Sequence, residues 1–275
     1  MTDDSPFERP EVELTPLERR RLRFRRIPIR IVLPNLVTLL ALSMGLTAIR
    51  YAVEGKFEMA VLAVMAAAVL DGLDGRLARA LKGATRFGAE LDSLADFVDF
   101  GVAPALLLYF WALHEIKNLG WFAALAFAIA CALRLARFNV MAEDPARPAW
   151  QSQFFVGMPS PAGAVTVLLP LYLHLSVFEL PASKMLAPVY ILYVLAIALL
   201  MASPIPHFSG KKLGRVPRDL MIPLLFGFGA LLLLLATYPM EVLIVLSLAY
   251  LATIPISLRR YRALADAEKE RTPAA

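Results

Sequence analysis

Four aspartates between residues 71 and 96 have the spacing of a metal site. Asp71 and Asp74 are three residues apart and Asp92 and Asp96 are four apart, so each pair shares one face of a helix. The connection between the two helices is short, which makes them antiparallel neighbours whose acidic faces can meet. Carboxylate oxygens suit Mg²⁺, Mn²⁺ or Ca²⁺. The cluster therefore predicts a two-metal site of the kind that stabilises the attacking and leaving oxygens in a phosphoryl displacement.

Small residues and one cation accompany these acids. Gly75 follows Asp74 and Ala78 lies one turn further, so together they open a notch on one helix face where a ligand can approach the backbone. Gly88, one turn before Asp92, does the same on the next helix. Arg79 supplies a guanidinium whose geometry matches phosphate. Aspartates that merely extend from the membrane interface into water would not explain these glycines.

The composition indicates that the helices carrying these residues lie in a membrane. Hydrophobic residues make up 59% of the 275 residues and charged residues only 19%, below the roughly 25% of soluble domains. Each carboxylate at membrane depth costs at least about 2.5 kcal/mol unless it is compensated, which again favours bound cations. Eight apolar stretches are long enough to span a bilayer: 32–52, 57–80, 89–112, 119–139, 160–178, 185–203, 219–237 and 241–258.

We expect an all-α membrane protein with eight transmembrane helices around a polar cavity that opens to the cytoplasm. A basic cytoplasmic arm (1–31) with a short amphipathic helix at about 15–27 precedes the transmembrane domain (32–258), and a cytoplasmic tail (259–275) follows it. With both termini in the cytoplasm, 24 of the 28 lysines and arginines fall on the cytoplasmic side, as the positive-inside rule requires.

The remaining composition excludes several classes of protein. The seven arginines between Glu18 and Arg30 adjoin an apolar span, so they suit anionic lipid headgroups better than nucleic acid. No secretory signal peptide is evident. The single cysteine, Cys131, cannot form an intrachain disulfide, and the three histidines form no cluster.

The motif D-x2-D-G-x2-A-R-x8-G-x3-D-x3-D, which runs from Asp71 to Asp96, resembles the signature of the CDP-alcohol phosphotransferases at every position. Within that family the chain is most similar to the phosphatidylserine synthases. Asp99 departs from the Ser or Asn that is commoner there, and its role stays open. The similar segments cover most of residues 33–212: LPNLVTLL, GAELDSLADFVDFGVAPA, RLARFN, GMPSPAGA and SPIPHFSGKK.

The resemblance implies a reaction in which CDP-diacylglycerol and L-serine give phosphatidylserine and CMP. Asp71, Asp74 and Asp92 would hold two Mg²⁺ or Mn²⁺ ions with help from Asp96, which would also be the general base. Arg79 and the metals would neutralise the diphosphate. The resemblance further implies a homodimer in the bacterial inner membrane.

Further binding residues are expected at the cytoplasmic helix ends. By resemblance, Asn35 and Thr38 would join Gly75, Ala78, Arg79 and Gly88 in binding CDP-diacylglycerol, although Asn35 and Thr38 could equally cap a helix. For the carboxylate of serine or a lipid phosphate, the candidates are Arg134, Arg137, Asn139, Lys211 and Lys212, which could instead be plain membrane anchors.

Two alternatives remain open. The same chemistry could use another acceptor alcohol such as glycerol 3-phosphate. A phosphorylated acceptor needs additional cationic groups, and the few candidate cations on the acceptor side mildly favour a zwitterionic amino acid. The acids could instead belong to a cation-binding membrane transporter. Their position at the interface, beside an arginine suited to phosphate, favours catalysis over transport.

Overall fold

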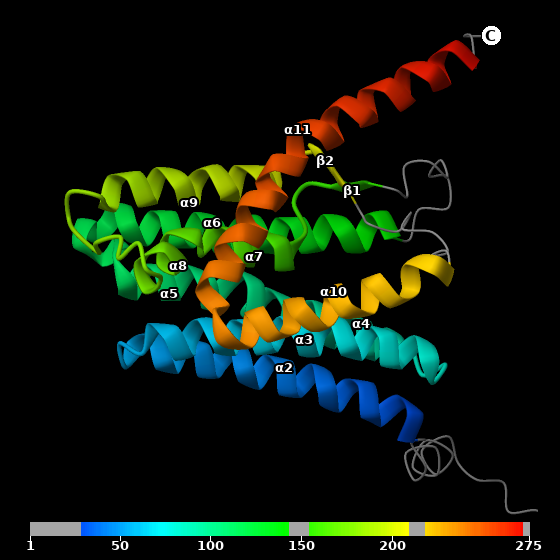
Figure 1. Ribbon diagram of the computed structural model, residues 1–275, viewed down its shortest axis with the longest axis horizontal. Coiled ribbons are helices and arrows are strands. Elements are labelled where there is room, and N and C mark those ends of the chain that lie inside the picture. Colours follow the sequence, from blue (N-terminus) through cyan, green and yellow to red (C-terminus); the bar gives the residue numbers. More distant parts are fainter. Residues whose placement is uncertain (1–28, 143–153, 209–217, 272–275) are drawn as a thin grey trace, which may run out of the picture.

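The computed structural model describes residues 29–142, 154–208 and 218–271. The expected amphipathic helix at 15–27 lies outside these ranges, as do Lys211 and Lys212. The described chain forms a bundle of roughly parallel and antiparallel helices, with α6 and α9 side by side along one edge and α2 and α3 along the other (Figure 1). Its segments are α2 (Ile29–Val53), α3 (Phe57–Ala80), α4 (Arg86–Asp96), η1 (Phe97–Val102), α5 (Ala103–Trp111), η2 (Leu113–Ile116), α6 (Lys117–Ala142), β1 (Phe154–Val156), α7 (Ser160–Val167), α8 (Leu169–Leu175), α9 (Ala187–Ala202), β2 (Pro206–Phe208), α10 (Arg218–Thr237) and α11 (Pro239–Arg271).

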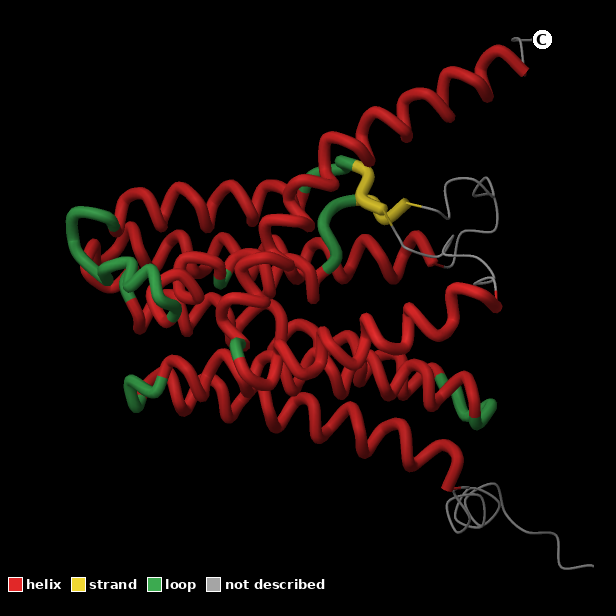
Figure 2. The backbone as a smooth tube through the Cα atoms, in the orientation of Figure 1, coloured by secondary structure: helices red, strands yellow, loops and turns green. Residues whose placement is uncertain are grey.

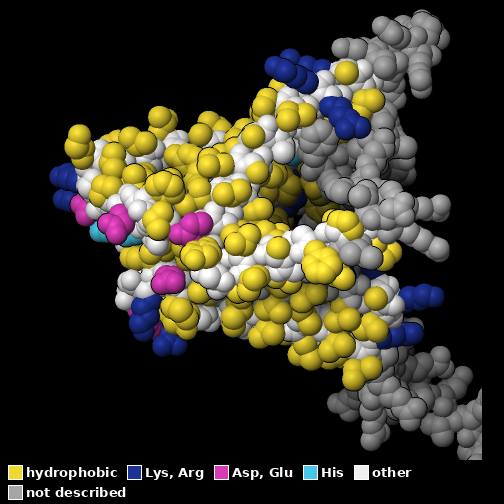
Figure 3. Space-filling model, in the orientation of Figure 1, with side chains coloured by type: hydrophobic (Ala, Val, Ile, Leu, Met, Phe, Trp, Pro, Cys, Tyr) yellow, Lys and Arg dark blue, Asp and Glu magenta, His cyan; other side chains and the backbone are white. Residues whose placement is uncertain are grey.

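Each of the eight apolar stretches contains helix, and four of the described helices are long and apolar enough to cross a membrane. These four are Ile29–Val53, Arg86–Trp111, Leu113–Met141 and Pro239–Leu264. Their length and composition indicate a membrane protein, while the number of eight spans stays a prediction. Hydrophobic side chains cover most of the face seen in Figure 3, as expected of a surface that meets lipid.

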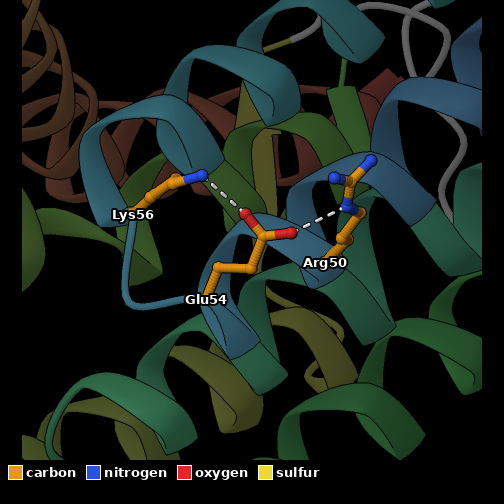
Figure 4. A network of polar contacts seen from close by, with 3 residues as sticks. All are labelled: Arg50, Glu54 and Lys56. Atoms are coloured by element: carbon orange, nitrogen blue, oxygen red, sulfur yellow. Dashed lines mark hydrogen bonds and ion pairs between the residues drawn. The ribbon is translucent and has the colours of Figure 1, made fainter.

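Small residues allow α2 and α3 to pack closely. Ala41, Gly45, Ala48 and Ala52 are buried and recur every three or four residues along one face of α2. In a membrane, such a stripe lets two backbones approach without large side chains between them. The α2–α3 turn is closed by Glu54, which accepts hydrogen bonds from Arg50 and Lys56, each at 2.8 Å (Figure 4). This turn lies at the end of α3 opposite to the aspartates.

Two of the predicted helices are interrupted. The stretch at 89–112 begins at Arg86, after Thr85 caps α4 by accepting a hydrogen bond of 3.0 Å from the Gly88 amide, and it contains the wide π-helical turn η1. The stretch at 160–178 breaks at Leu168 into α7 and α8. Pro170 explains this break, because proline lacks the amide hydrogen that would continue the α-helical ladder.

A short two-stranded sheet corrects the all-α expectation. β1 and β2 pair antiparallel, with Phe155 opposite His207, although about fifty residues separate them in the sequence. The Ser257 hydroxyl of α11 donates a hydrogen bond of 2.8 Å to the Pro206 carbonyl and so ties this sheet to the last helix. The sheet lies at the same end of the bundle as the α3–α4 turn (Figure 2). Helix α11 continues to Arg271, into the predicted tail.

Candidate metal and phosphate site

The last turns of α3 and the first turns of α4 bring three aspartates together. One carboxylate oxygen each from Asp71, Asp74 and Asp92 lie within 4.8 Å of one another. Asp74 is buried and the other two are half-buried. The prediction that the two acidic faces meet across the short α3–α4 connection is therefore confirmed. Three hard oxygen ligands at this separation fit a divalent metal ion.

Asp96 lies next to this triad, at the end of α4. Its carboxyl group is within hydrogen-bonding reach of that of Asp71, and its Oδ1 is buried without a hydrogen-bond partner in the described part of the chain. Acidic groups this close repel one another unless a cation or a proton lies between them. The unpartnered oxygen supports the fit of a divalent metal, which Asp71, Asp74 and Asp92 would hold with Asp96 adjacent.

Thr38 of α2 positions one of these ligands. Its hydroxyl is 2.6 Å from Asp74 Oδ2 and 3.2 Å from the Pro34 carbonyl, and its side chain is only 5% exposed. A hydroxyl that donates to one carboxylate oxygen fixes the carboxylate and leaves the other oxygen for a metal. The sequence carried no signal for this contact, because Thr38 and Asp74 are 36 residues apart.

A cavity of about 170 Å³ opens beside the triad, and we call it the Arg79 cavity. All six residues predicted to bind CDP-diacylglycerol line it, together with two of the metal aspartates. The six are Asn35, Thr38, Gly75, Ala78, Arg79 and Gly88, and the two aspartates are Asp74 and Asp92. One arginine, several small residues and two aspartates thus line one cavity, a combination that suits a phosphate-bearing ligand.

The two glycines of this cavity serve different purposes. A Cβ added at Gly75 would meet only Arg79 Nη1 at 3.7 Å, so Gly75 keeps the floor of the cavity open below that guanidinium. A Cβ added at Gly88 would come within 2.9 Å of Asn35 Oδ1. Gly88 therefore allows α4 to approach α2 and bring Asn35 to the cavity wall.

The three described residues predicted to bind the acceptor have different surroundings. Arg134 is buried, donates a hydrogen bond of 3.0 Å to the Ser160 hydroxyl, and interacts electrostatically with Asp96 and Asp71. Arg137 instead donates to the carbonyls of Ala202 and Ser203 at the end of α9, at 2.7 and 3.1 Å.

Asn139 donates a hydrogen bond of 3.0 Å to the Ser93 hydroxyl and so joins α6 to α4. Among these three residues, Arg134 is the one with an electrostatic interaction with Asp71 and Asp96. A role in binding the acceptor stays a prediction for all three residues.

Sequence reasoning missed the pairing of His207 with Tyr250. His207 Nδ1 is 2.9 Å from the Tyr250 hydroxyl, the two rings are stacked, and His207 is 1% exposed. Burial lowers the pKa of His207 to about 4, so its ring is neutral at pH 7. Tyr250 in turn interacts with Arg134, which connects the two-stranded sheet to the acidic site. Histidines scattered in the sequence gave no hint of this contact.

Asp99 is the deepest acid of this region. It lies in η1, is 1% exposed, and its Oδ1 has no hydrogen-bond partner among the described residues. The carboxyl group packs directly against α2, where a Cβ added at Gly45 would collide with it. The sequence identified Asp99 as unusual but gave it no role.

Comparisons with known proteins place this site in a family. The model of the CDP-alcohol phosphatidyltransferases matches residues 31–202, which include the whole aspartate motif. A protein of Mycobacterium leprae is 39% identical over 249 residues, which cover 89% of this chain and 80% of the relative. One of Mycobacterium bovis is 40% identical over 239 residues, covering 86% of this chain and 81% of the relative.

A protein of Helicobacter pylori is 37% identical over 181 residues, which cover 65% of this chain and 73% of that relative. All three are named CDP-diacylglycerol–serine O-phosphatidyltransferase. The family match spans more than half of the chain, and the resemblance seen in the motif is confirmed. The chain belongs to the CDP-alcohol phosphatidyltransferase family.

Proposed function

We propose that this protein transfers the phosphatidyl group of CDP-diacylglycerol to the hydroxyl of L-serine, with phosphatidylserine and CMP as products. The observation that carries this proposal is the Arg79 cavity, which an arginine, the open face of Gly75, Gly88 and two aspartates of the triad line together. The names of the relatives supply the acceptor, because those from both Mycobacterium and Helicobacter are serine O-phosphatidyltransferases.

In this proposal the diphosphate of CDP-diacylglycerol lies in the Arg79 cavity. The exposed Arg79 guanidinium forms a bidentate contact with phosphate oxygens, and Asn35 contacts the nucleotide. Asp71, Asp74 and Asp92 would hold Mg²⁺ or Mn²⁺, which would neutralise the charge of the diphosphate. Thr38 acts on this site through its hydrogen bond to Asp74.

The acceptor lies on the side of the acids that faces Arg134. The buried guanidinium, held by Ser160, binds the carboxylate of serine. Asp96 accepts the proton of the serine hydroxyl while the hydroxyl oxygen bonds to the phosphorus that bears diacylglycerol. The bond from that phosphorus to the oxygen of CMP breaks, and CMP leaves with the bonding electrons.

The setting of this reaction follows from the sequence pattern. We propose eight transmembrane helices in the bacterial inner membrane, with both termini and the catalytic cavity on the cytoplasmic side. The transmembrane domain is residues 32–258, between the basic arm 1–31 and the tail 259–275. A homodimer is the assembly that the family resemblance favours.

A panel of acceptors tests the proposal. Purified protein receives CDP-diacylglycerol, Mn²⁺ or Mg²⁺, and either serine, glycerol 3-phosphate, inositol phosphate or choline. Serine should exceed every other acceptor by at least about tenfold in kcat/KM, equal to about 1.4 kcal/mol of transition-state discrimination. A preference for glycerol 3-phosphate would refute the serine assignment and leave the family chemistry intact.

A cation transporter is the alternative from another class. An assay of the reverse reaction distinguishes an enzyme from a transporter. The protein receives labelled phosphatidylserine together with CMP, and an enzyme should release labelled CDP-diacylglycerol and serine. A protein that binds Mn²⁺ but forms no CDP-diacylglycerol under any condition would contradict the enzymatic proposal.

A further inference from the structure

Asp99 is an acidic side chain that the proposed mechanism leaves unused. Its side chain is 1% exposed, and Oδ1 has no hydrogen-bond partner in the described part of the chain. Asp99 interacts electrostatically with Asp71, another acid, whereas Arg134 directs its charge to Asp96 and Asp71. A buried carboxylate without a partner is costly unless a cation or hydrogen-bond donors compensate it. A ligand that brings its own positive charge would supply the missing partner.

The position of Asp99 relates it to the acceptor. Asp99 follows Asp96 by three residues, and both acids interact electrostatically with Asp71, so their carboxyl groups lie beside the same residue. Two carbon atoms separate the hydroxyl of serine from its ammonium group. A serine whose hydroxyl lies at Asp96 can therefore place its ammonium group near Asp99. Asp99 does not belong to the triad of Asp71, Asp74 and Asp92, whose oxygens lie within 4.8 Å of one another.

The surroundings hold Asp99 in place. Its carboxyl group lies against the backbone of Gly45, where any larger residue would collide with it. It also lies within the π-helical turn Phe97–Val102, and such turns occur frequently at functional sites. A carboxylate fixed in this way is preorganised for a compact cation with several donors, which an ammonium group provides.

We propose that Asp99 binds the ammonium group of the acceptor amino acid. With Arg134 at the carboxylate, the site then holds opposite charges for the two ends of a zwitterion. This inference rests on the proposed function and adds the residue that selects an α-amino acid over acceptors without an amine. A neutral alcohol or a phosphorylated acceptor gains nothing from Asp99.

The test compares two acceptors in three proteins. L-serine and 3-hydroxypropionate, which is serine without its amine, are supplied to the wild type, Asp99→Asn and Asp99→Ser. Both variants should raise the KM for serine roughly 10- to 100-fold, the worth of a charged hydrogen bond. The KM for CDP-diacylglycerol should stay unchanged, and the preference for serine over 3-hydroxypropionate should fall by at least about tenfold. Glu90→Gln removes an exposed acid of the same helix and should match the wild type.

Each other outcome overturns the inference. An unchanged KM and preference would show that Asp99 does not touch the amine. Equal loss of rate with both acceptors, or inactivity of both variants, would assign Asp99 to packing, since an acceptor without an amine needs no ammonium ligand. The wild-type arm tests the proposed function separately, because a wild type that does not use serine refutes that proposal before any variant is compared.

Discussion

Replacing Thr38 by valine removes a single hydrogen bond from the metal site while keeping the shape of the side chain. The hydroxyl lies 2.6 Å from Asp74 Oδ2 in a buried setting. Losing a hydrogen bond to a charged group costs about 1.5–3 kcal/mol when the charged partner stays buried without another donor. At about 1.4 kcal/mol per factor of ten, Thr38→Val should weaken the binding of activating metal by roughly 10- to 100-fold.

The assay is the rate of CMP release in detergent micelles as a function of Mn²⁺ concentration, at saturating CDP-diacylglycerol and serine. Thr38→Val should shift the curve to higher Mn²⁺, and excess metal should restore much of the rate. Thr38→Ser keeps the hydroxyl and should stay within a few-fold of the wild type. Thr47→Val is the matched control, since Thr47 is on the same helix but donates its hydrogen bond to the Ser43 carbonyl at an exposed position.

A curve for Thr38→Val that coincides with the wild type would refute the role of Thr38 in holding Asp74. A fall in the maximal rate that Mn²⁺ does not restore, with an unchanged midpoint, would point instead to a direct contact between Thr38 and the nucleotide.

Three further predictions concern the same site and the sheet beside it. Removing metal with EDTA should abolish activity, and Mg²⁺ or Mn²⁺ should restore it; full activity in metal-stripped protein would contradict a metal site at the aspartates. Asp96→Asn should lower turnover roughly 10²–10⁴-fold and keep the affinity for the nucleotide, whereas Asp71→Asn should lower affinity and turnover together. The affinity is measured as CDP binding at several Mn²⁺ concentrations. Equal loss of affinity in both variants would show that Asp96 is chiefly a metal ligand. Because the pKa of His207 is lowered to about 4, the unfolded chain binds a proton between pH 6.5 and 4 that the folded chain does not, so acid should destabilise the fold by up to about 1.4 kcal/mol per pH unit in that window. The Tm should therefore fall less with acid in His207→Gln than in the wild type, and parallel curves would contradict this role.

The site was predictable from the sequence where its chemistry is local. The spacing of the aspartates on two consecutive helices sets which faces meet, because a short turn between antiparallel helices leaves little freedom. The triad of aspartates and the Arg79 cavity follow from that rule. The eight apolar stretches were also predictable from local sequence. In lipid the backbone must satisfy its own hydrogen bonds, so a long apolar stretch forms a helix.

The remaining features depend on contacts between distant segments. Thr38 meets Asp74 across α2 and α3, and His207 meets Tyr250 across β2 and α11. A pattern of apolar residues states which segments are helical, but not which side chain of one helix faces a given side chain of another. The pairing of β1 with β2 is of the same kind, because strands of three residues carry too little periodicity to be recognised.

The π-helical turn Phe97–Val102 makes this helix sensitive to length. A π-helical turn places one more residue between bonded groups than an α-helical turn, so deleting one residue would convert it to α-helix. Everything beyond it would then rotate by about 100° relative to α4. Leu107, Leu108 and Trp111, which α5 buries in the core, would turn towards lipid while the aspartates stayed in place. This segment should therefore accept no single-residue insertion or deletion, and related sequences should align through it without a gap.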